Sequence, residues 1–522
     1  MEAVQEQKTF KFDKPYLKRT IWIGLAFFGI LLVWQLYNSY CAPMLSLLFV
    51  KHDFPGAIEQ AKVTMAAAVA AGQMKEKDAV VNMKNILAYG GLTQKDYLSV
   101  QWKVGVIMAL DNIAALFIMP LFGRWSDKTK SKLGKRMPYI IIGSIITAIA
   151  LPFIPLFFSN GMGADNAKIV GMIVGLICTM VVVIIFMMSY RSPAVSLMPD
   201  LTPKPLRSKA NGIINIVGYV GGAIGSIFAI VIPVTKYIDG TNRSLWMLEI
   251  PFIVCSVVLL ISLALLLWKV KENKLHAELD DEIRRGDSMG ESAEQVTDSG
   301  KLSKNNLRNL ILILVAEVFW FMSLNAVETF QTNYCMFWLN TSSAGGAIMT
   351  VISGAASVVG FLVAGIIADK IGRKWTIFLG ICVVAACYVA YAFVPKVEPS
   401  ADVGVFESSL PWIFFILLPT IGLGSSLIHI CSFPLVTDYC TADKLGRFTS
   451  LYYTASMLAQ SLTPIVIGFI FINTSWQALP IYSASLMGVA GLVFFFVKAP
   501  KRNDTAKNAK GLEALEALAE ED

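Results

Sequence analysis

The sequence predicts an all-α polytopic membrane protein whose twelve transmembrane helices form two similar six-helix bundles. Three observations carry this prediction: the composition, the number of long apolar runs, and a loop motif that occurs twice. Of the 522 residues, 55% are hydrophobic and only 16% are charged, and the mean hydropathy is +0.61. Such a composition excludes a water-soluble globular protein.

Twelve apolar runs are long enough to cross a hydrocarbon core about 30 Å thick, which takes roughly 20 residues. The first run follows a basic tail, residues 1–20, and is too long for a signal-peptide core, so we expect it to be retained. The runs lie at 21–49, 101–122, 138–158, 169–190, 211–235, 247–268, 307–336, 345–367, 375–394, 411–436, 448–472 and 479–497.

Two segments interrupt the alternation of apolar runs and short loops. Residues 270–306 form a charged linker between a first bundle, 21–269, and a second bundle, 307–498, which is followed by a tail, 499–522. Residues 51–99 form a much longer loop with a helix-prone middle. We expect this loop to be a partly helical lid or cap.

Lysine and arginine set the orientation, because cytoplasmic loops hold the excess of both. With the N-terminus inside, the short inner loops carry fifteen basic residues and the short outer loops carry four. Both termini are therefore expected in the cytoplasm, in a bacterial inner membrane or a plasma membrane. The net charge of +7 reflects this topology and contact with anionic lipids, and it requires no nucleic-acid partner.

A loop motif follows the second apolar run and returns after the eighth, 238 to 242 residues later. A second loop motif, after runs four and ten, repeats at the same period, which indicates a duplicated six-helix unit. Gly123, Asp127, Gly134, Lys135 and Arg136 recur as Gly365, Asp369, Gly372, Arg373 and Lys374, while Asp200 and Arg207 recur as Asp438 and Arg447.

The repeated loops predict a conformational latch. Glycine at a helix end permits close packing, and the aspartate four residues later can pair with basic residues or face a helix N-terminus. Such a contact can form in one state and break in another. A plain positive-inside anchor would explain the lysines, but it would not explain why the glycine and aspartate spacing occurs twice.

The second loop, "GIIADKIGRK" at 365–374, resembles the signature loop of the major facilitator superfamily. The first, "SDKTKSKLGKRMPYI" at 126–140, is similar to the form found in sucrose-type proton symporters and their glycoside-pentoside-hexuronide relatives. "RSPAVSLMPDLTPKPLRSKANGIIN" at 191–215 and "NAVETF" at 325–330 extend the resemblance. It implies two six-helix bundles related by a pseudo-twofold axis along the membrane normal, with a substrate cavity between them.

Three carboxyl groups within the apolar runs are candidates for proton coupling. An ionisable residue costs roughly 2.5–3.5 kcal/mol at a helix centre unless it faces protein or water, so it marks a functional site by default. Asp111 could hold a proton, or form a structural hydrogen bond to a neighbouring helix. Glu317 and Glu328 are eleven residues apart, so both point to one helix face about 16 Å apart. Either could carry a proton or accept a sugar hydroxyl, and Glu317 could instead pair with an interfacial cation.

Further polar and aromatic residues predict a sugar-binding lining. Arg191 closes the fourth run and could present several donors to sugar oxygens, or serve only as a cytoplasmic anchor. Indole rings can stack on a pyranose while amides bond its hydroxyls. The remaining candidates are Trp34, Gln35, Asn38, Trp320, Asn325, His429 and Gln460.

The sequence contains no motif for an enzyme, a metal site or a nucleotide-driven pump. The three histidines are isolated in sequence and the eight cysteines are scattered singly, so we expect no metal and no cofactor other than a coupling ion, H⁺. The resemblance implies a monomeric symporter that imports a glycoside, such as sucrose, maltose or another α-glucoside, with protons. A sodium-coupled symporter, a proton-driven exporter and a transport-dead sensor remain open.

Overall fold

The computed structural model describes residues 13–76, 79, 83–203, 206–238, 247–294, 304–399, 404–439 and 445–498. Twelve helical spans within these residues are long and apolar enough to cross a membrane, which confirms the predicted fold class. Besides helices and turns, the described residues contain one isolated β-bridge, between Thr341 and Ser408.

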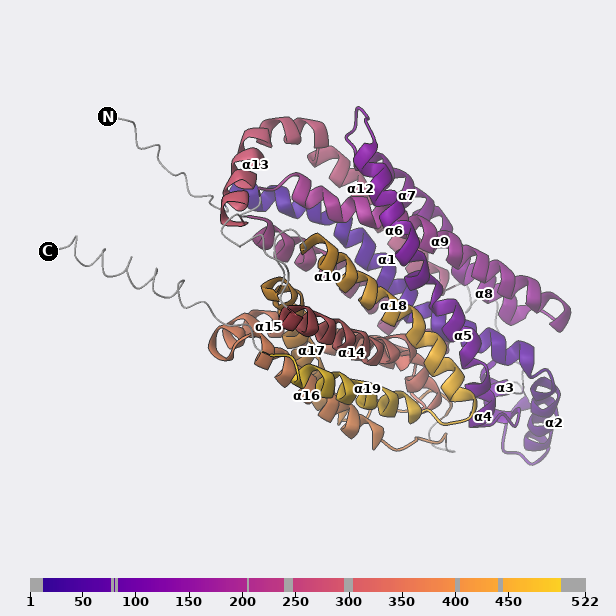
Figure 1. Cartoon of the computed structure of the whole chain (residues 1–522). Helices are drawn as coiled ribbons and strands as arrows, with labels where there is room; N and C mark the ends of the chain where they lie inside the picture. The colour runs from indigo at the N-terminus through magenta and orange to yellow at the C-terminus, as the bar shows by residue number, and fades with distance from the viewer. Residues whose placement is uncertain are drawn as a thin grey trace, which may run out of the picture.

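Six spans form the N-half and six form the C-half, and Figure 1 shows the indigo-to-magenta helices above the orange and yellow ones. Two spans of the N-half are each made of two helices. The N-half contains α1 (Lys14–Asp53), α5 (Gln101–Met108) with α6 (Leu110–Lys128), α7 (Met137–Ala150) with α8 (Phe153–Gly163), α9 (Asn166–Asp200), α10 (Arg207–Val231) and α12 (Glu249–Lys269). The C-half contains α14 (Lys304–Phe337), α15 (Ala344–Ile371), α16 (Arg373–Ala392), α17 (Phe414–Tyr439), α18 (Leu445–Ile472) and α19 (Ala478–Phe495).

Three short helices, α2 (Gly56–Ala70), α3 (Met83–Tyr89) and α4 (Gln94–Ser99), lie together at one end of the molecule. We call this end the cap face. The opposite end is the linker face, because it carries α13 (Glu272–Glu294), the helix with which the charged linker begins. The long loop and the linker are therefore both largely helical where they are described.

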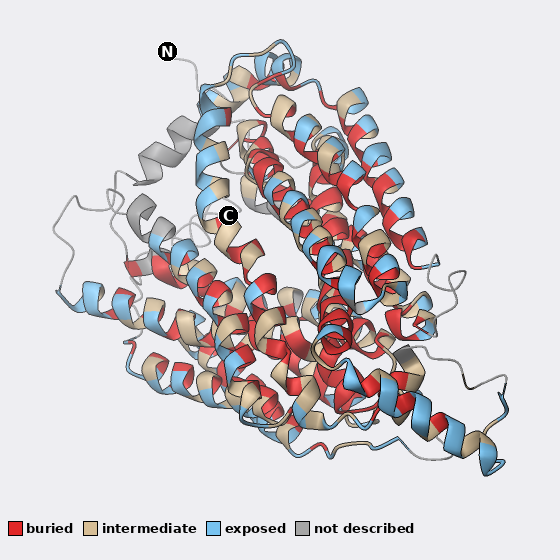
Figure 2. Cartoon of the chain, turned by 90° about the vertical axis from the view of Figure 1, so that its right-hand side faces the viewer, coloured by how far each residue is buried: buried red, intermediate tan, exposed pale blue. Residues whose placement is uncertain are grey.

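Large apolar side chains are exposed along the outward faces of the spans, whereas the sides that face other helices are buried (Figure 2). On α12, for example, Ile253, Val257 and Ile261 are exposed while Phe252 and Leu259 are buried. In water such a surface would aggregate, but in a bilayer it is the lipid-facing surface, since each helix satisfies its own backbone hydrogen bonds.

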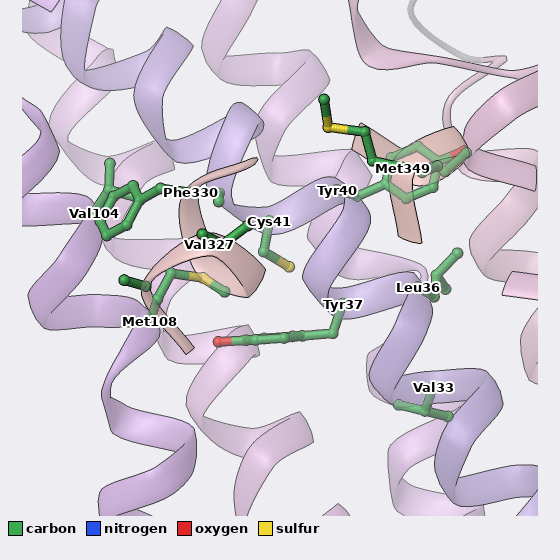
Figure 3. Packing of buried hydrophobic residues seen from close by; sticks show 14 of the residues in the cluster. Val33, Leu36, Tyr37, Tyr40, Cys41, Val104, Met108, Val327, Phe330 and Met349 are labelled. Atoms are coloured by element: carbon green, nitrogen blue, oxygen red, sulfur yellow. The ribbon is translucent and has the colours of Figure 1, made fainter. Parts of the chain in front are cut away.

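The two halves meet closely at the cap face. A methyl group at Gly105 of α5 would collide with the carbonyl oxygen of Pro464 in α18, so only glycine permits this approach. Nearby, Phe330 and Val327 of α14 pack between α1 and α5, beside Cys41 and Met108 (Figure 3). An apolar seal of three helices therefore closes the interface on this side.

Candidate functional site

The second span is broken at Ala109, next to Asp111. Helix α5 ends at Met108 and α6 begins at Leu110, while Ala109 keeps helical φ and ψ angles and donates to the Gly105 carbonyl at 3.0 Å. The Asp111 carboxylate accepts from the backbone N–H of Asn112 at 2.6 Å and from its side-chain Nδ2 at 2.9 Å. Asp111 is 3% exposed and lies at the positive end of a helix. Broken helices at this depth are common binding elements in transporters.

Asp111, Arg191 and Glu328 come from α6, α9 and α14 and interact electrostatically with one another. Within the described residues, neither carboxylate forms an ion pair with Arg191, which instead lies over the indole ring of Trp34, 5.2 Å from the ring centroid. We call these three charged residues the central triad. Its groups are close enough to attract one another, but none is locked in a direct pair.

Glu328 joins the two halves at the triad. Its Oε1 accepts from Asn38 Nδ2 at 3.3 Å, and its carboxylate also accepts a hydrogen bond from Trp34, so both donors come from α1. The Glu328 side chain is exposed although it lies in the middle of a span, whereas Asn325, one turn away, is 7% exposed. Glu328 is thus accessible to a water-sized or larger molecule from within the protein.

Glu317 lies outside the triad, in the interior of the C-half. It is fully buried, and neither carboxylate oxygen has a hydrogen-bond partner among the described residues. It interacts electrostatically with Tyr452 and Tyr453 of α18. The helical spacing placed Glu317 and Glu328 on one face, but only Glu328 reaches the interface between the halves.

The other predicted lining residues are divided between the interface and the core. Trp320 is a correction: it is fully buried and packs against Phe494 of α19, 6.2 Å between ring centroids, so it is part of the C-half core. His429 lies 5.4 Å from the ring of Phe321. Gln35 donates to Ser39 at 3.3 Å within its own helix. Gln460 is half-buried on α18, and its side chain forms no hydrogen bond with another described residue.

The structure adds polar residues that the sequence reading missed. Asn333 of α14 donates to Ser46 of α1 at 2.8 Å and to Gln101 of α5 at 2.9 Å, and all three side chains are fully buried. We call this group the polar lock, because it ties the two halves together. Thr235 of the N-half likewise contacts Ser342 at 2.9 Å. The sequence did contain a signal for these residues. Burying a polar side chain within an apolar run is unfavourable unless the side chain is hydrogen-bonded, and this holds for amides as well as for charged groups.

These contacts place the closure of the interface on the cap face. Along their helices, the polar lock, the pair formed by Thr235 and Ser342, and the apolar seal all lie nearer the cap face than the triad does. The molecule is therefore held shut on the cap side of the triad.

The first predicted latch is formed within the N-half. Arg136 pairs with Asp127 at 2.5 Å and with Asp200 at 2.8 Å, and Lys135 lies 3.1 Å from Asp200. Arg207 instead donates to the backbone carbonyls of Thr202 and Pro199. Gly123 packs where a Cβ would meet Ser192 of α9.

In the second latch, Gly372 ends α15 with φ +86°, and Arg373 donates to the Pro434 carbonyl at 3.3 Å. Lys374 lies over the ring of Trp375, 4.6 Å from its centroid. Gly365 meets no neighbouring atom that a Cβ would contact. The side chains of Asp369, Asp438 and Arg447 lie outside the described residues.

The linker helix completes the first latch. The Glu272 carboxylate accepts from the backbone N–H groups of Lys135, Arg136 and Met137 at 2.9 to 3.2 Å, and thereby caps the N-terminus of α7. Gly134 has φ +116°, and a Cβ there would overlap the Glu272 carboxylate. Glycine is required at this position for both reasons.

The sequence matches the family model described as Major Facilitator Superfamily over residues 89–341 and 310–519. Among curated proteins, the sucrose transport protein SUC3 of Arabidopsis thaliana is 31% identical over 131 residues, which is 22% of this chain and 22% of that protein. That local match thus covers about a fifth of the relative.

Two solved structures are similar over nearly their whole length. The inward-open xylose transporter XylE from E. coli has a TM-score of 0.62 at 14% identity, covering 94% of this chain and 97% of that one. A bacterial homologue of the iron transporter ferroportin, in an inward-facing state, has a TM-score of 0.59 at 12% identity, covering 92% and 98%. At such identities the likeness shows the fold alone.

Proposed function

Because the chain belongs to the major facilitator superfamily, a family of transporters, we propose that it is a secondary active symporter that imports a glycoside together with a proton. The linker face is then cytoplasmic, and the conformation is inward-facing. The partial likeness to a plant sucrose transport protein favours an α-glucoside such as sucrose or maltose as the substrate.

One observation carries the proposal: the central triad lies where the two halves meet, with Glu328 exposed and bonded to α1. Glu328, Asn38 and Arg191 offer acceptors and donors for sugar hydroxyls, and Trp34 supplies an apolar face. A small polar ligand bound there would contact both halves and could therefore couple its binding to their relative motion.

Asp111 is our proposed site of the coupling proton. Two carboxyl groups and one guanidinium balance in charge when one carboxyl is protonated, and Asp111 is the buried one. Loss of its proton would leave a second negative charge beside Arg191, altering the attraction across the interface. Proton entry is worth about 2.3 kcal/mol per 100 mV, enough for a roughly fifty-fold sugar gradient.

The decisive experiment measures external pH around de-energised cells that express the protein, after addition of individual sugars. Symport predicts alkalinisation of the medium with at least one α-glucoside and no response in cells without the protein. A sugar response that depends on sodium and leaves pH unchanged would replace the proton by Na⁺. Acidification when unrelated apolar compounds are added to the medium and enter in exchange for internal protons, with no response to any sugar, would overturn the proposal.

A further inference from the structure

A cavity of about 510 Å³ lies on the cap face between the cap helices and the C-half. One wall is formed by residues 87–97 of the cap, and the other by the end of α14 and the loop that follows α16. Its size is within the range of small-molecule sites, roughly 300–1,000 Å³. The central triad is not part of its lining.

The lining has the chemistry of a site for a neutral polyhydroxylated ligand. Its charged side chains are Lys396 and Glu398, which pair with each other at 2.6 Å, so the described wall carries no net charge. Tyr89 and Tyr97 contribute aromatic rings and hydroxyl groups. The side-chain Nε2 of Gln94 is buried here without a hydrogen-bond partner among the described residues, and a ligand oxygen would satisfy it.

The cavity exists only while the cap lies against the C-half. Tyr97 of α4 stacks on Phe337 of α14 with 4.8 Å between ring centroids, and Lys84 of α3 pairs with Glu407 at 2.6 Å. Opening of the cap face would separate both pairs and divide the two walls of the cavity. Any ligand bound here therefore favours the closed cap face by mass action.

We propose that this cavity is a second glycoside site, at which sugar from the cap side holds the cap face closed and slows entry into the central site. The identity of the ligand rests on the proposed function, whereas the cavity and its two walls do not. The long 51–99 segment thereby acquires a role: it builds half of an inhibitory site.

The test is equilibrium binding of labelled sucrose or maltose, whichever alkalinises the medium, to the full-length protein in lipid nanodiscs. We expect two classes of site. Ala88→Trp, which fills the cavity mouth, and Gln94→Leu, which removes the unpartnered amide, should each abolish the weaker class while the Kd of the tighter class changes by less than two-fold. Ala66→Trp, on the exposed face of α2 away from the cavity, is the matched control and should retain both classes.

Transport provides the second readout. In proteoliposomes, the initial uptake rate of the wild type should pass through a maximum and fall at least two-fold at high external sugar, and Ala88→Trp should remove this fall. A single class of site in the wild type, or a weaker class that survives both Ala88→Trp and Gln94→Leu, overturns this inference and leaves the symport proposal intact. Absence of both alkalinisation and binding with every α-glucoside overturns the symport proposal instead.

Discussion

At the scale of single residues, the central triad contains two carboxyl groups and one guanidinium, and among the described residues none of the three forms a direct ion pair. Arg191 lies over Trp34 rather than against a carboxylate, and Glu328 takes neutral donors from α1. A buried pair with ideal geometry would be hard to separate during a transport cycle. The loose arrangement suits groups that must exchange a proton and a ligand.

Asp111→Asn tests the coupling role. A coupling carboxyl must bind and release its proton in every energised cycle, but sugar exchange across the membrane does not need that release. We expect Asp111→Asn to abolish pH-driven accumulation while sugar counterflow stays within about two-fold of the wild type. Glu249→Gln, which changes another buried carboxyl outside the triad, is the control. Accumulation by Asp111→Asn would refute the assignment.

Glu328→Gln tests the sugar-facing role. Loss of a charged acceptor for a sugar hydroxyl costs about 1.5–3 kcal/mol, so we expect the apparent affinity to fall by roughly 10-fold or more in both accumulation and counterflow. Unchanged affinity together with loss of accumulation would exchange the roles of Glu328 and Asp111. The same two assays with Glu317→Gln separate the proposed site from the third carboxyl candidate.

At the scale of elements, the loop between α6 and α7 is built around two clusters of charge. On one side Arg136 forms ion pairs with Asp127 and Asp200. On the other side the Glu272 carboxylate accepts hydrogen bonds from the backbone of the loop. The linker helix is therefore attached to the N-half at its first turn. A chain segment that seems from its charge to be a free connector is anchored by one buried carboxylate.

Glu272→Ala should destabilise the N-half. Removing the carboxylate leaves three helix N-terminal N–H groups without a cap, and we expect a loss of about 2–4 kcal/mol in the free energy of unfolding. Thermal unfolding of the purified protein measures it. Glu278→Ala, an exposed carboxyl on the same helix, should change stability by less than about 0.5 kcal/mol. Gly134→Ala should resemble Glu272→Ala, and equal melting temperatures for Glu272→Ala and the wild type would contradict the capping role.

Asp127→Asn should act on the cycle rather than on the fold. Asp127 is 59% exposed and Arg136 keeps its contact with Asp200, so stability should fall by less than about 1 kcal/mol. If the pair belongs to one conformer, transport per molecule should fall several-fold while abundance and insertion are unchanged. Normal transport by Asp127→Asn would reduce the loop to a topological anchor. Asp165→Asn, an exposed carboxyl outside the latch, is the control.

At the scale of the whole molecule, the polar lock and the apolar seal hold one side of the interface shut. The lock is buried, so the two hydrogen bonds that Asn333 donates to Ser46 and Gln101 exist only in this conformation, and the three side chains must be hydrated in the other. Alternating access requires that the two states differ by only a few kcal/mol. Closure must therefore be balanced by contacts that form at the linker face in the opposite state.

The pair formed by Lys84 and Glu407 makes closure of the cap face dependent on the pH at that face. The hydrogen bond and charge of Lys84 lower the pKa of Glu407 when the cap is closed. The pair therefore stabilises closure above the ordinary carboxyl pKa, and its contribution is lost as pH falls through the lowered value. Since both groups are partly exposed, the effect is below about 1 kcal/mol.

Pulsed electron resonance between spin labels on α2 and α17 measures this dependence. The distance distribution should begin to shift towards longer distances as pH falls below the ordinary glutamate pKa of about 4.3, and the shift should be complete only below the lowered pKa of Glu407. Lys84→Met should show no such shift. An identical response in Lys84→Met and the wild type would assign the pH effect to another group.

The sequence by itself determined the twelve spans and their division into two related halves, and it named Asp111, Arg191 and Glu328 among its candidate residues. Run length and the cost of a charge in lipid are properties of a short stretch of chain, so they can be read without knowing its neighbours. The family follows from the repeated loop for the same reason, since the motif is local and occurs twice.

Only the tertiary structure decided which of these residues meet. Helical spacing gave Glu317 and Glu328 the same face, but Glu317 is buried against α18 whereas Glu328 reaches across to α1. Helical periodicity likewise could not predict that Trp320 packs in the C-half core, that Glu272 caps α7, or that the second span breaks at Ala109. Periodicity determines the direction of a side chain from its own helix, whereas its partner depends on which helix packs there, and that is a property of the assembled bundle.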